Sequence, residues 1–599
     1  MMRKNITLAN TANDAQEHKS YPGMGVMRKK STLLLFSGTA GLITALSGLA
    51  VNLSRAAELV TAPHPPVDHI LFATSLHCMA CHSKVFAPNG EDISIGYQWR
   101  ASVMANSARD PYWQAGIRRE TIDHPTAKAD IEDTCSRCHM PMQRFQARAE
   151  NKQGEVFRYL EAIRSGAATV EPEANLEDVA DVKATLAADG VSCTVCHQIR
   201  PDNFGQESSL DGNFIVDITK KDEERELFGP FDVDKGRTRI MHSTTGFTPT
   251  KADHIRQSEL CATCHTLLTT ALDPQGKAIG SLPEQVPYQE WQHSDYPNTN
   301  SCQSCHMPRV EGEAAITSVQ GKTHEEVSRH VFVGGNSFLL RILKDHKNEL
   351  GVIATTDELE ASAARTDQQL ATITAAVEIK NAAVAAGRLD FAVTVTNKSG
   401  HKFPTAYPAR RAWLHIAVRD SRGAMVFESG ALRPDGSVVG NDNDEDALKF
   451  EPHYTRITSP DQVQIYESIM SDSANRPTTG LLNATHYLKD NRLLPRGFNK
   501  ATAEERVAVV GPARDDADFV GGSDTVAYSV ALPTGNAGPY TVTAEMYFES
   551  IGFRWAQNLR NYDADEPKRF VGYYTQAAGQ SAKLIARTAL TTNGPLAPR

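Results

Sequence analysis

The sequence predicts a multidomain chain in which a mainly α-helical and irregular part is followed by a β-sandwich-like domain. All ten cysteines lie between residues 78 and 306, among short helical patterns and loops marked by Pro and Gly. Beyond about residue 378 there is no cysteine, and apolar residues alternate with a period of two, as in half-buried strands. We therefore place the predicted segments at 1–57, 58–350, 351–377 and 378–599.

The first segment, residues 1–57, has the pattern of an export signal. Met27 begins a basic run, residues 31–54 carry no charge and are rich in Leu, Ala and Gly, and small residues follow at Ala56. This order is typical of a signal peptide, and translation is expected to begin at Met24 or Met27. The apolar run is also long enough to span a membrane, so a retained anchor is the alternative. We expect a periplasmic or extracellular protein.

Every cysteine belongs to one of five copies of the pattern Cys-x-x-Cys-His, which is the attachment signature of c-type haem. Two cysteines three residues apart face the same side of a helical turn, so both thiols reach one porphyrin. The histidine that follows can bind the iron. We number the copies motif 1 to motif 5 in chain order, and their residues are Cys78, Cys81 and His82; Cys135, Cys138 and His139; Cys193, Cys196 and His197; Cys261, Cys264 and His265; and Cys302, Cys305 and His306.

Three other uses of cysteine fit this pattern poorly. A structural zinc site needs closed sets of four ligands and gives no reason for a histidine after every second cysteine. A thioredoxin-like dithiol would occur once, beside a βαβ pattern, and a disulfide scaffold would not space its cysteines so uniformly. The sequence therefore predicts five covalently attached haem c groups, with the motif histidines as proximal iron ligands.

The motifs follow one another closely. The stretch available to each haem is far shorter than the ~100 to 150 residues of a self-sufficient domain, so the five porphyrins must share one core. Haems packed in one core are near neighbours, and such an arrangement conducts electrons.

Charge narrows the expected partners. The formal net charge of the 599 residues is -10, and haem propionates would add further negative charge, so nucleic acid is not expected as a partner. We expect redox partner proteins, or a small molecule. Membrane contact is expected only through a retained N-terminal anchor, and the sequence leaves the oligomeric state open.

The second half of the chain begins with a predicted helical connector from Thr356 to about Thr374, because Thr356, Asp357 and Glu358 resemble a cap and an acidic first turn. Period-two alternation then predicts strands near residues 389–395, 414–418, 526–532 and 540–548. These fit a β-sandwich with helical insertions, one of them at 480–489.

The iron of each haem needs a second axial ligand. The chain has 20 histidines, of which five lie in the motifs. The remaining histidines outnumber the five irons that need a distal ligand, so we expect mostly closed haems, with a histidine on both faces. A haem without a distal ligand would instead be able to bind a substrate.

The segments 258–266, 302–308, 330–336 and 400–405 resemble those of bacterial multihaem cytochromes. This broad group includes pentahaem nitrite reductases, hydroxylamine oxidoreductases and small tetrahaem carriers, here with an added C-terminal β-domain. None of the five motifs ends in Lys, unlike the catalytic motif of the nitrite reductases. The resemblance therefore supports cofactor and fold more than a reaction. Its implied distal ligands are His242, His254, His330, His401 and, from the similar segment 99–111, Met104.

Two classes of function follow. The first is an exported pentahaem electron carrier, with a filament subunit as a variant in which one iron takes its distal histidine from the next copy. The second is a haem oxidoreductase that acts on a small inorganic nitrogen or sulfur compound at one open iron. The surplus of histidines favours the carrier.

Overall fold

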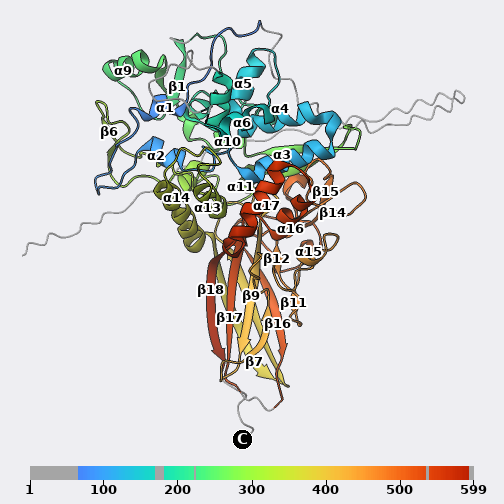
Figure 1. The fold of residues 1–599 in the computed structure, drawn as a ribbon. Helices are drawn as coiled ribbons and strands as arrows, with labels where there is room; N and C mark the ends of the chain where they lie inside the picture. The colour runs from blue at the N-terminus through green and yellow to red at the C-terminus, as the bar shows by residue number, and fades with distance from the viewer. Residues whose placement is uncertain (1–64, 167, 169–180, 222–223, 535–537, 593–599) are drawn as a thin grey trace, which may run out of the picture. The chain divides into compact units, whose positions relative to one another are not determined.

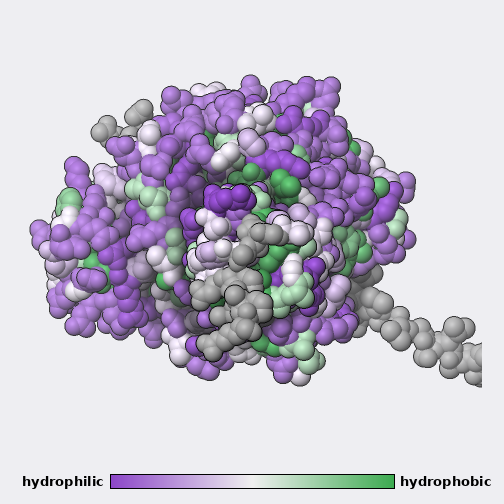
Figure 2. Space-filling view, turned by 90° about the horizontal axis from the view of Figure 1, so that it is seen from below, coloured by the Kyte–Doolittle hydropathy of each residue, from purple (hydrophilic) through white to green (hydrophobic). Residues whose placement is uncertain are grey.

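The computed structural model describes residues 65–166, 168, 181–221, 224–534 and 538–592, all of which belong to one compact unit, Ala56–Arg599 (Figure 1). The predicted signal segment, 1–57, lies outside the described residues. Within the part of the chain that is described, no helix is both long enough and apolar enough to cross a membrane. The face seen from the strand end is mostly hydrophilic (Figure 2).

The N-terminal part is built from short helices joined by loops. Local signals explain them: Asp110 caps α3, its side chain accepting the N–H groups of Tyr112 and Trp113 at 2.8 and 3.2 Å, and Pro111 occupies the first turn. The helices are α1 (Ser75–Met79), α2 (Ile95–Arg100), α3 (Pro111–Asp123), α4 (Lys128–His139), α5 (Pro141–Ala149), α6 (Phe157–Arg164), α7 (Val182–Ala188), α8 (Cys193–Cys196), α9 (Lys235–Thr245), α10 (Ser258–Ala262), α11 (Pro287–Gln292), α12 (Cys302–His306) and α13 (Ser337–Asp345).

Three small two-stranded sheets lie among these helices. Their strands are β1 (Glu226–Gly229) with β2 (Thr248–Lys251), β3 (Leu267–Leu272) with β4 (Ala278–Gln285), and β5 (Ala314–Ala315) with β6 (Thr323–His324).

The connector is helical, as predicted. Helix α14 spans Thr356–Gln369, and a π-helical turn, η6 (Leu370–Thr374), leads into the first long strand. Its cap is Thr355 rather than Thr356: the Thr355 side chain accepts the N–H of Glu358, and the Glu358 side chain accepts the N–H of Thr355. Thr355 has an extended backbone and directly precedes the first helical residue, which is the N-cap position that a capping box requires.

The C-terminal part is rich in strands, and two sheets pack face to face around its core. One sheet has the order β10-β9-β17-β18 with β12 beside β9, the other has the order β11-β16-β8-β7, and β18 lies next to β7. The strands are β7 (Ala375–Ala385), β8 (Arg388–Asn397), β9 (Arg411–Arg419), β10 (Met425–Ser429), β11 (Arg456–Ile457), β12 (Ile465–Tyr466), β16 (Ser523–Ala531), β17 (Tyr540–Glu549) and β18 (Ala582–Thr592).

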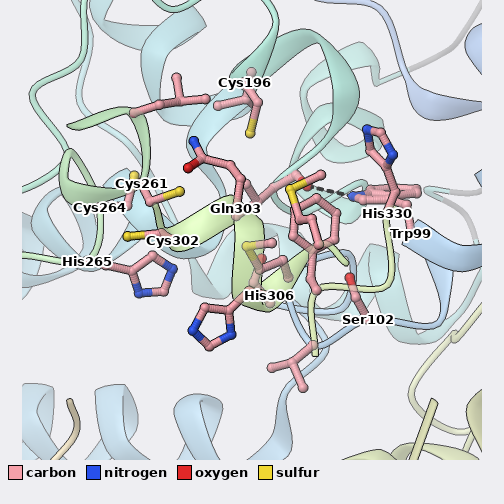
Figure 3. A pocket seen from close by; sticks show the side chains of 18 of the residues that line it. Trp99, Ser102, Cys196, Cys261, Cys264, His265, Cys302, Gln303, His306 and His330 are labelled. Carbon is pink, nitrogen blue, oxygen red and sulfur yellow. Dashed lines mark hydrogen bonds between the residues drawn. The ribbon is translucent and has the colours of Figure 1, made fainter. Parts of the chain in front are cut away.

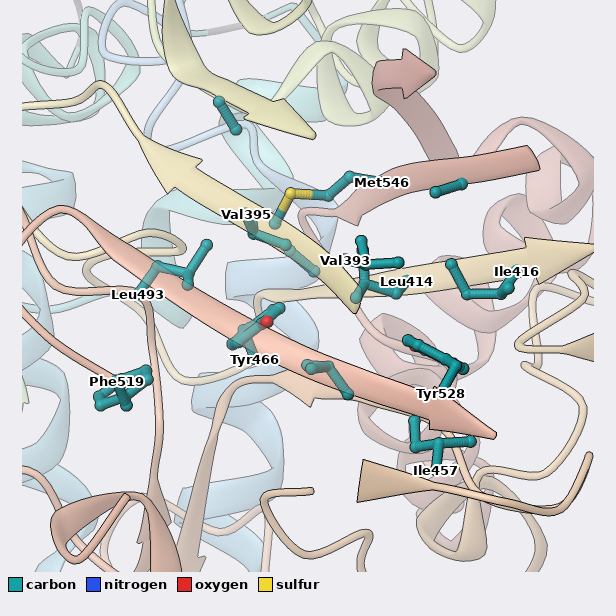
Figure 4. Close-up of a cluster of buried hydrophobic side chains, with 14 of the residues drawn as sticks. Val393, Val395, Leu414, Ile416, Ile457, Tyr466, Leu493, Phe519, Tyr528 and Met546 are labelled. Atoms are coloured by element: carbon teal, nitrogen blue, oxygen red, sulfur yellow. The ribbon is translucent and has the colours of Figure 1, made fainter. Parts of the chain in front are cut away.

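Alternate residues of these strands form the core between the sheets (Figure 4). Val393 of β8, Leu414 of β9, Val526 of β16 and Met546 of β17 have no exposed surface. Each such side chain contributes about 1.5 to 3 kcal/mol by leaving water. The period-two pattern read from the sequence is therefore the burial pattern of the sheets.

The predicted helical insertion at 480–489 is wrong. The segment forms β15 (His486–Asp490), which pairs with β13 (Ser468–Ser471), and β14 (Pro477–Thr478) completes this third sheet. The N–H groups of Leu481 and Leu482 donate to the carboxylate of Glu120 at 2.9 and 3.2 Å. These distant partners satisfy the backbone in place of helical hydrogen bonds.

Three further helices, α15 (Asp442–Glu445), α16 (Phe553–Asn558) and α17 (Asp565–Ala577), belong to the C-terminal part. Phe570 and Tyr574 of α17 are buried against Phe338 of α13, and α17 also lies against α3 (Figure 1). An ion pair between Arg118 and Glu566, 2.8 Å long, joins the same two helices. The N-terminal and C-terminal parts thus share one apolar core.

Candidate functional site

Each haem motif lies on, or at the end of, a short helix. Motif 1 begins in α1, motif 2 ends α4, motif 3 forms α8, motif 4 begins in α10 and motif 5 forms α12. In three motifs the histidine N–H donates to the carbonyl of the first cysteine: His82 to Cys78 at 2.9 Å, His197 to Cys193 at 3.0 Å and His265 to Cys261 at 2.9 Å. This helical turn holds the two cysteines on one side and the histidine beside them.

One connected cavity of about 1540 Å³ runs through the N-terminal part, and all fifteen cysteines and histidines of the five motifs line it. The residues that the sequence spreads from 78 to 306 are therefore brought to a common space. Most of the other lining side chains are apolar or aromatic, as a porphyrin requires.

The motif histidines are oriented by the backbone. In four of the five, Nδ1 lies within hydrogen-bond distance of a carbonyl oxygen: His82 with Ile316 at 2.7 Å, His139 with Ser107 at 3.2 Å, His197 with Phe228 at 2.6 Å and His306 with Val333 at 2.5 Å. A carbonyl only accepts, so Nδ1 carries the hydrogen and Nε2 keeps its lone pair. Metal-binding histidines are held in this way.

Burial favours the neutral form of the imidazoles of His139 and His265. It lowers the pKa of His139 to about 4 and, together with the neighbouring charges of His306 and Arg410, that of His265 to about 4. The neutral ring is the form that binds a metal. The side chains thus fit a set of haem irons in their orientation and protonation.

Two further histidines face motif histidines across the cavity. The rings of His197 and His330 are 6.5 Å apart between centroids and inclined by 18°, and those of His306 and His401 are 6.3 Å apart and inclined by 13°. Two imidazoles on opposite sides of one metal, with bonds of ~2.0 Å and ring radii of ~1.1 Å, have centroids roughly 6 Å apart. Both pairs have the separation of axial ligands to one iron.

The backbone also orients these two rings. Nδ1 of His330 lies 3.1 Å from the carbonyl oxygen of Ser328, and Nδ1 of His401 lies 2.9 Å from that of Lys402. Burial and the nearby His197 lower the pKa of His330 to about 3. His330 and His401 therefore present a neutral Nε2 toward the motif histidine, in the same manner as the motif histidines themselves.

A buried polar network fixes the loop that carries His401. Glu290 of α11, which has no exposed surface, accepts the N–H of Lys402 at 3.1 Å and the hydroxyl of Thr405 at 2.5 Å. Arg492 lies 2.8 Å from the other carboxylate oxygen of Glu290. Sequence analysis did not identify Glu290 or Arg492, because only the tertiary fold brings α11 next to this loop.

His254 is not among the residues that line the cavity. It is buried, its Nε2 is 2.9 Å from the carbonyl oxygen of Ile199, and its ring meets those of Phe204 and Phe228 edge to face. Nε2 is therefore engaged by the backbone.

His242 and Met104 occupy different positions. His242 is on α9 and is not among the residues that line the cavity, although its neighbour Met241 is. Met104 does line the cavity. Met241 and His324 are further lining residues with ligand atoms that sequence analysis missed, because no short pattern distinguishes them from other core or loop residues.

Ionisable side chains also gather in the cavity next to motif 2. The hydrogen-bonded rings of Tyr112 and Tyr407 meet edge to face at 5.9 Å, and Thr269 donates to Glu284 at 2.5 Å. Burial, with added repulsion from other carboxylates, raises the pKa of Glu284 to about 7, and its charge acts on Cys135. Sequence analysis missed this cluster because its members come from α3, β3, β4 and the 401–410 loop.

Cysteines of different motifs touch one another. Hydrogen-bond contacts between thiols join Cys78 with Cys193, Cys138 with Cys264, and Cys261 with Cys302. In Figure 3 the sulfur atoms of Cys261, Cys264 and Cys302 gather on one side of the cavity. Motif 4 therefore contacts both motif 2 and motif 5, and motif 1 contacts motif 3.

No family model and no curated protein matches this sequence. Among solved structures, the chain is similar to a penta-heme cytochrome c552 from Thermochromatium tepidum, with a TM-score of 0.48 and 16% sequence identity over 87% of this chain and 100% of that chain.

Proposed function

We propose that the chain is an exported electron-transfer protein that holds five haem c groups, one on each motif. The observation that carries the proposal is the single cavity lined by all five motifs. The paired rings of His197 with His330 and of His306 with His401 support closed irons at motifs 3 and 5, and a haem with two histidine ligands transfers electrons without binding a substrate.

In this proposal the haems supply iron that changes between two oxidation states, and the chain positions them. Each pair of cysteines fixes one porphyrin edge, and backbone carbonyls aim the histidine Nε2 atoms at the iron. The contacts between thiols of different motifs place motif 4 next to motifs 2 and 5 and motif 3 next to motif 1, so haems attached there would be near neighbours. Short edge-to-edge distances are what electron tunnelling needs.

Two features of the sequence support a proposed location and a proposed class of partner. The basic and apolar pattern within residues 1–57 supports export to the periplasm or beyond the cell, with cleavage of the signal or retention as an anchor as alternatives. The net charge of -10 supports a redox partner protein with a basic docking surface.

The decisive test compares two candidate ligands with different surroundings: His330 faces a motif histidine, whereas Nε2 of His254 contacts a backbone carbonyl. His330→Ala should keep all five attached haems but convert one of them from low spin to high spin, because its ring faces His197. His254→Ala is the matched control and should leave the spin state of every haem as in the parent, since its Nε2 is held by Ile199. Electron paramagnetic resonance of the oxidised proteins distinguishes them, and identical spectra of the two variants would contradict the proposal.

A haem oxidoreductase remains the second candidate function, and the group of Tyr112, Tyr407 and Glu284 beside motif 2 favours it. Buried groups with raised pKa values are typical of sites that handle protons. Binding of carbon monoxide or nitrite to the reduced parent protein, followed by difference spectroscopy, tests this function. A spectral change that Tyr407→Phe alters would support the enzyme, and no change would exclude an open iron.

A further inference from the structure

A second group of ionisable side chains lies in the strand-rich part and takes no part in lining the haem cavity. His453, Asp516 and Asp524 are buried, and their potential ligand atoms all lie within 4.8 Å of one another. The carboxyl of Asp518, which is exposed, contacts that of Asp516. Three carboxyl groups thus converge at the loop that precedes β16.

One carboxylate oxygen in this group is buried without a hydrogen bond. Asp524 has no exposed surface; its Oδ2 accepts the hydroxyl of Tyr466 at 2.7 Å and the amide of Gln464 at 3.3 Å. Its Oδ1 has no hydrogen-bond partner among the described residues and lies 3.9 Å from Nε2 of His453. Leaving such an oxygen unpaired costs about 1 to 3 kcal/mol or more, so a positive partner is expected there.

The histidine cannot supply a metal-binding lone pair. Its Nδ1 lies 3.1 Å from Nδ2 of Asn491, whose Oδ1 accepts the N–H of Glu467 at 3.0 Å, so the Asn491 amide has a fixed orientation. Nδ1 of His453 therefore accepts, and Nε2 carries the hydrogen and donates it to Asp516 at 2.9 Å. Only oxygen ligands remain, which suit a hard cation such as Ca²⁺ rather than Zn²⁺.

The local charges also call for a cation. The carboxylate oxygens of Asp516 and Asp524 lie within 4.8 Å of each other, so their negative charges repel. The ammonium of Lys500 is close, but it donates to the backbone carbonyls of Ala513 and Asp516. Repulsion among the three carboxylates is therefore only partly compensated by the protein itself.

We propose that Asp516, Asp518 and Asp524 bind a hard divalent cation of the Ca²⁺ class, with backbone carbonyls or water completing its shell. The site would brace the loop of His401. The carbonyl of Gly522, two residues before Asp524, accepts the N–H of Asn397 at 2.9 Å, and the side chain of Asn397 donates to the carbonyl of His401 at 2.9 Å. This assignment is independent of the redox role proposed above.

Calorimetric titration of the chelator-treated full-length holoprotein with Ca²⁺ tests the site. The parent should bind Ca²⁺ saturably and gain thermal stability, and Asp524→Asn should weaken binding by more than about tenfold, because it removes a ligand charge. Asp518→Asn, at the exposed edge, gives the same comparison if Asp524→Asn fails to fold. Asp420→Asn is the control, since that carboxylate accepts the N–H groups of its own turn, and it should bind Ca²⁺ as the parent does.

Two results would overturn the assignment. Equal Ca²⁺ binding by the parent and by both site variants would place the ion elsewhere, for example on haem propionates. Absence of saturable Ca²⁺ binding, or tight Zn²⁺ binding without a response to Ca²⁺, would exclude a hard-cation site.

Discussion

A histidine is well placed to bind a haem iron when a backbone carbonyl holds its Nδ1 and its Nε2 points into the cavity. His330 and His401 meet both conditions through carbonyl oxygens one or two residues away. His254 has the reverse arrangement, because a carbonyl engages its Nε2. Sequence resemblance proposes all three residues as distal ligands, but it does not report which ring nitrogen the fold engages. That information is tertiary, so the sequence alone could not separate these three candidates.

The variant His401→Ala tests whether the strand-rich part supplies an iron ligand. All five haems should stay attached, since attachment uses only the motifs, while one haem becomes high spin, binds carbon monoxide and shifts its reduction potential. His415→Ala is a matched control, because its ring pairs with Glu545 at 2.9 Å on β17. If the optical redox titration curves of His401→Ala and the parent overlay, His401 is an ordinary loop residue.

The buried Glu284 carboxyl predicts a pH dependence. Its pKa rises from 4.5 to about 7 on folding, mainly because burial disfavours the charged form. Between these values the folded state holds a proton that the unfolded state has released, so the free energy of unfolding falls as pH rises from about 4.5 to about 7.

Glu284→Gln cannot ionise and should lose less stability than the parent between pH 5 and pH 8. Denaturant titrations at both pH values measure this difference, with Glu326→Gln, an exposed carboxyl, as the control. Equal losses in Glu284→Gln and the parent would contradict the raised pKa.

At the scale of elements, two sequence patterns carried most of the information. The Cys-x-x-Cys-His pattern specified five helical turns, and period-two alternation identified β8, β9, β16 and β17. Both patterns are local. The helix expected at 480–489 failed because β13 and the carboxylate of Glu120 pair with this segment from far away in the chain. Short strands with distant partners leave no comparable local pattern.

The alternation of apolar residues in β9 predicts which of its side chains stabilise the fold most. Leu414 has no exposed surface and lies in the core between the sheets, so Leu414→Ala should lower the free energy of unfolding by about 2 to 5 kcal/mol. Leu448, which is 63% exposed, is the control, and Leu448→Ala should change the free energy of unfolding by less than about 0.5 kcal/mol. Similar losses for the two variants, measured by denaturant titration, would contradict the assigned core.

At the scale of the whole molecule, the two parts are joined in three ways. Helix α17 shares a core with α3 and α13, Glu290 holds the loop 402–405, and the rings of His306 and His401 face each other. The boundary predicted at residue 378 lies inside β7, which begins at Ala375 directly after η6. It does not mark an interface free of contacts.

A fragment of residues 378–599 tests how far the strand-rich part folds alone. It keeps the core between the two sheets, so it should give a β-type circular dichroism spectrum, unfold cooperatively and show no haem absorbance. It also exposes the apolar face of α17, so it should self-associate in size-exclusion chromatography. An unfolded fragment would mean that contacts with the haem-bearing part are needed for folding.

If all ten cysteines hold haem, the mass of the denatured chain will show five haems attached to it. Covalent thioether attachment survives unfolding, so protein made in a host with cytochrome c maturation should have the mass of the polypeptide plus five haems. Replacing both cysteines of one motif by alanine should reduce the increment to four haems. A parent protein that carries fewer than five haems after complete maturation would contradict the account.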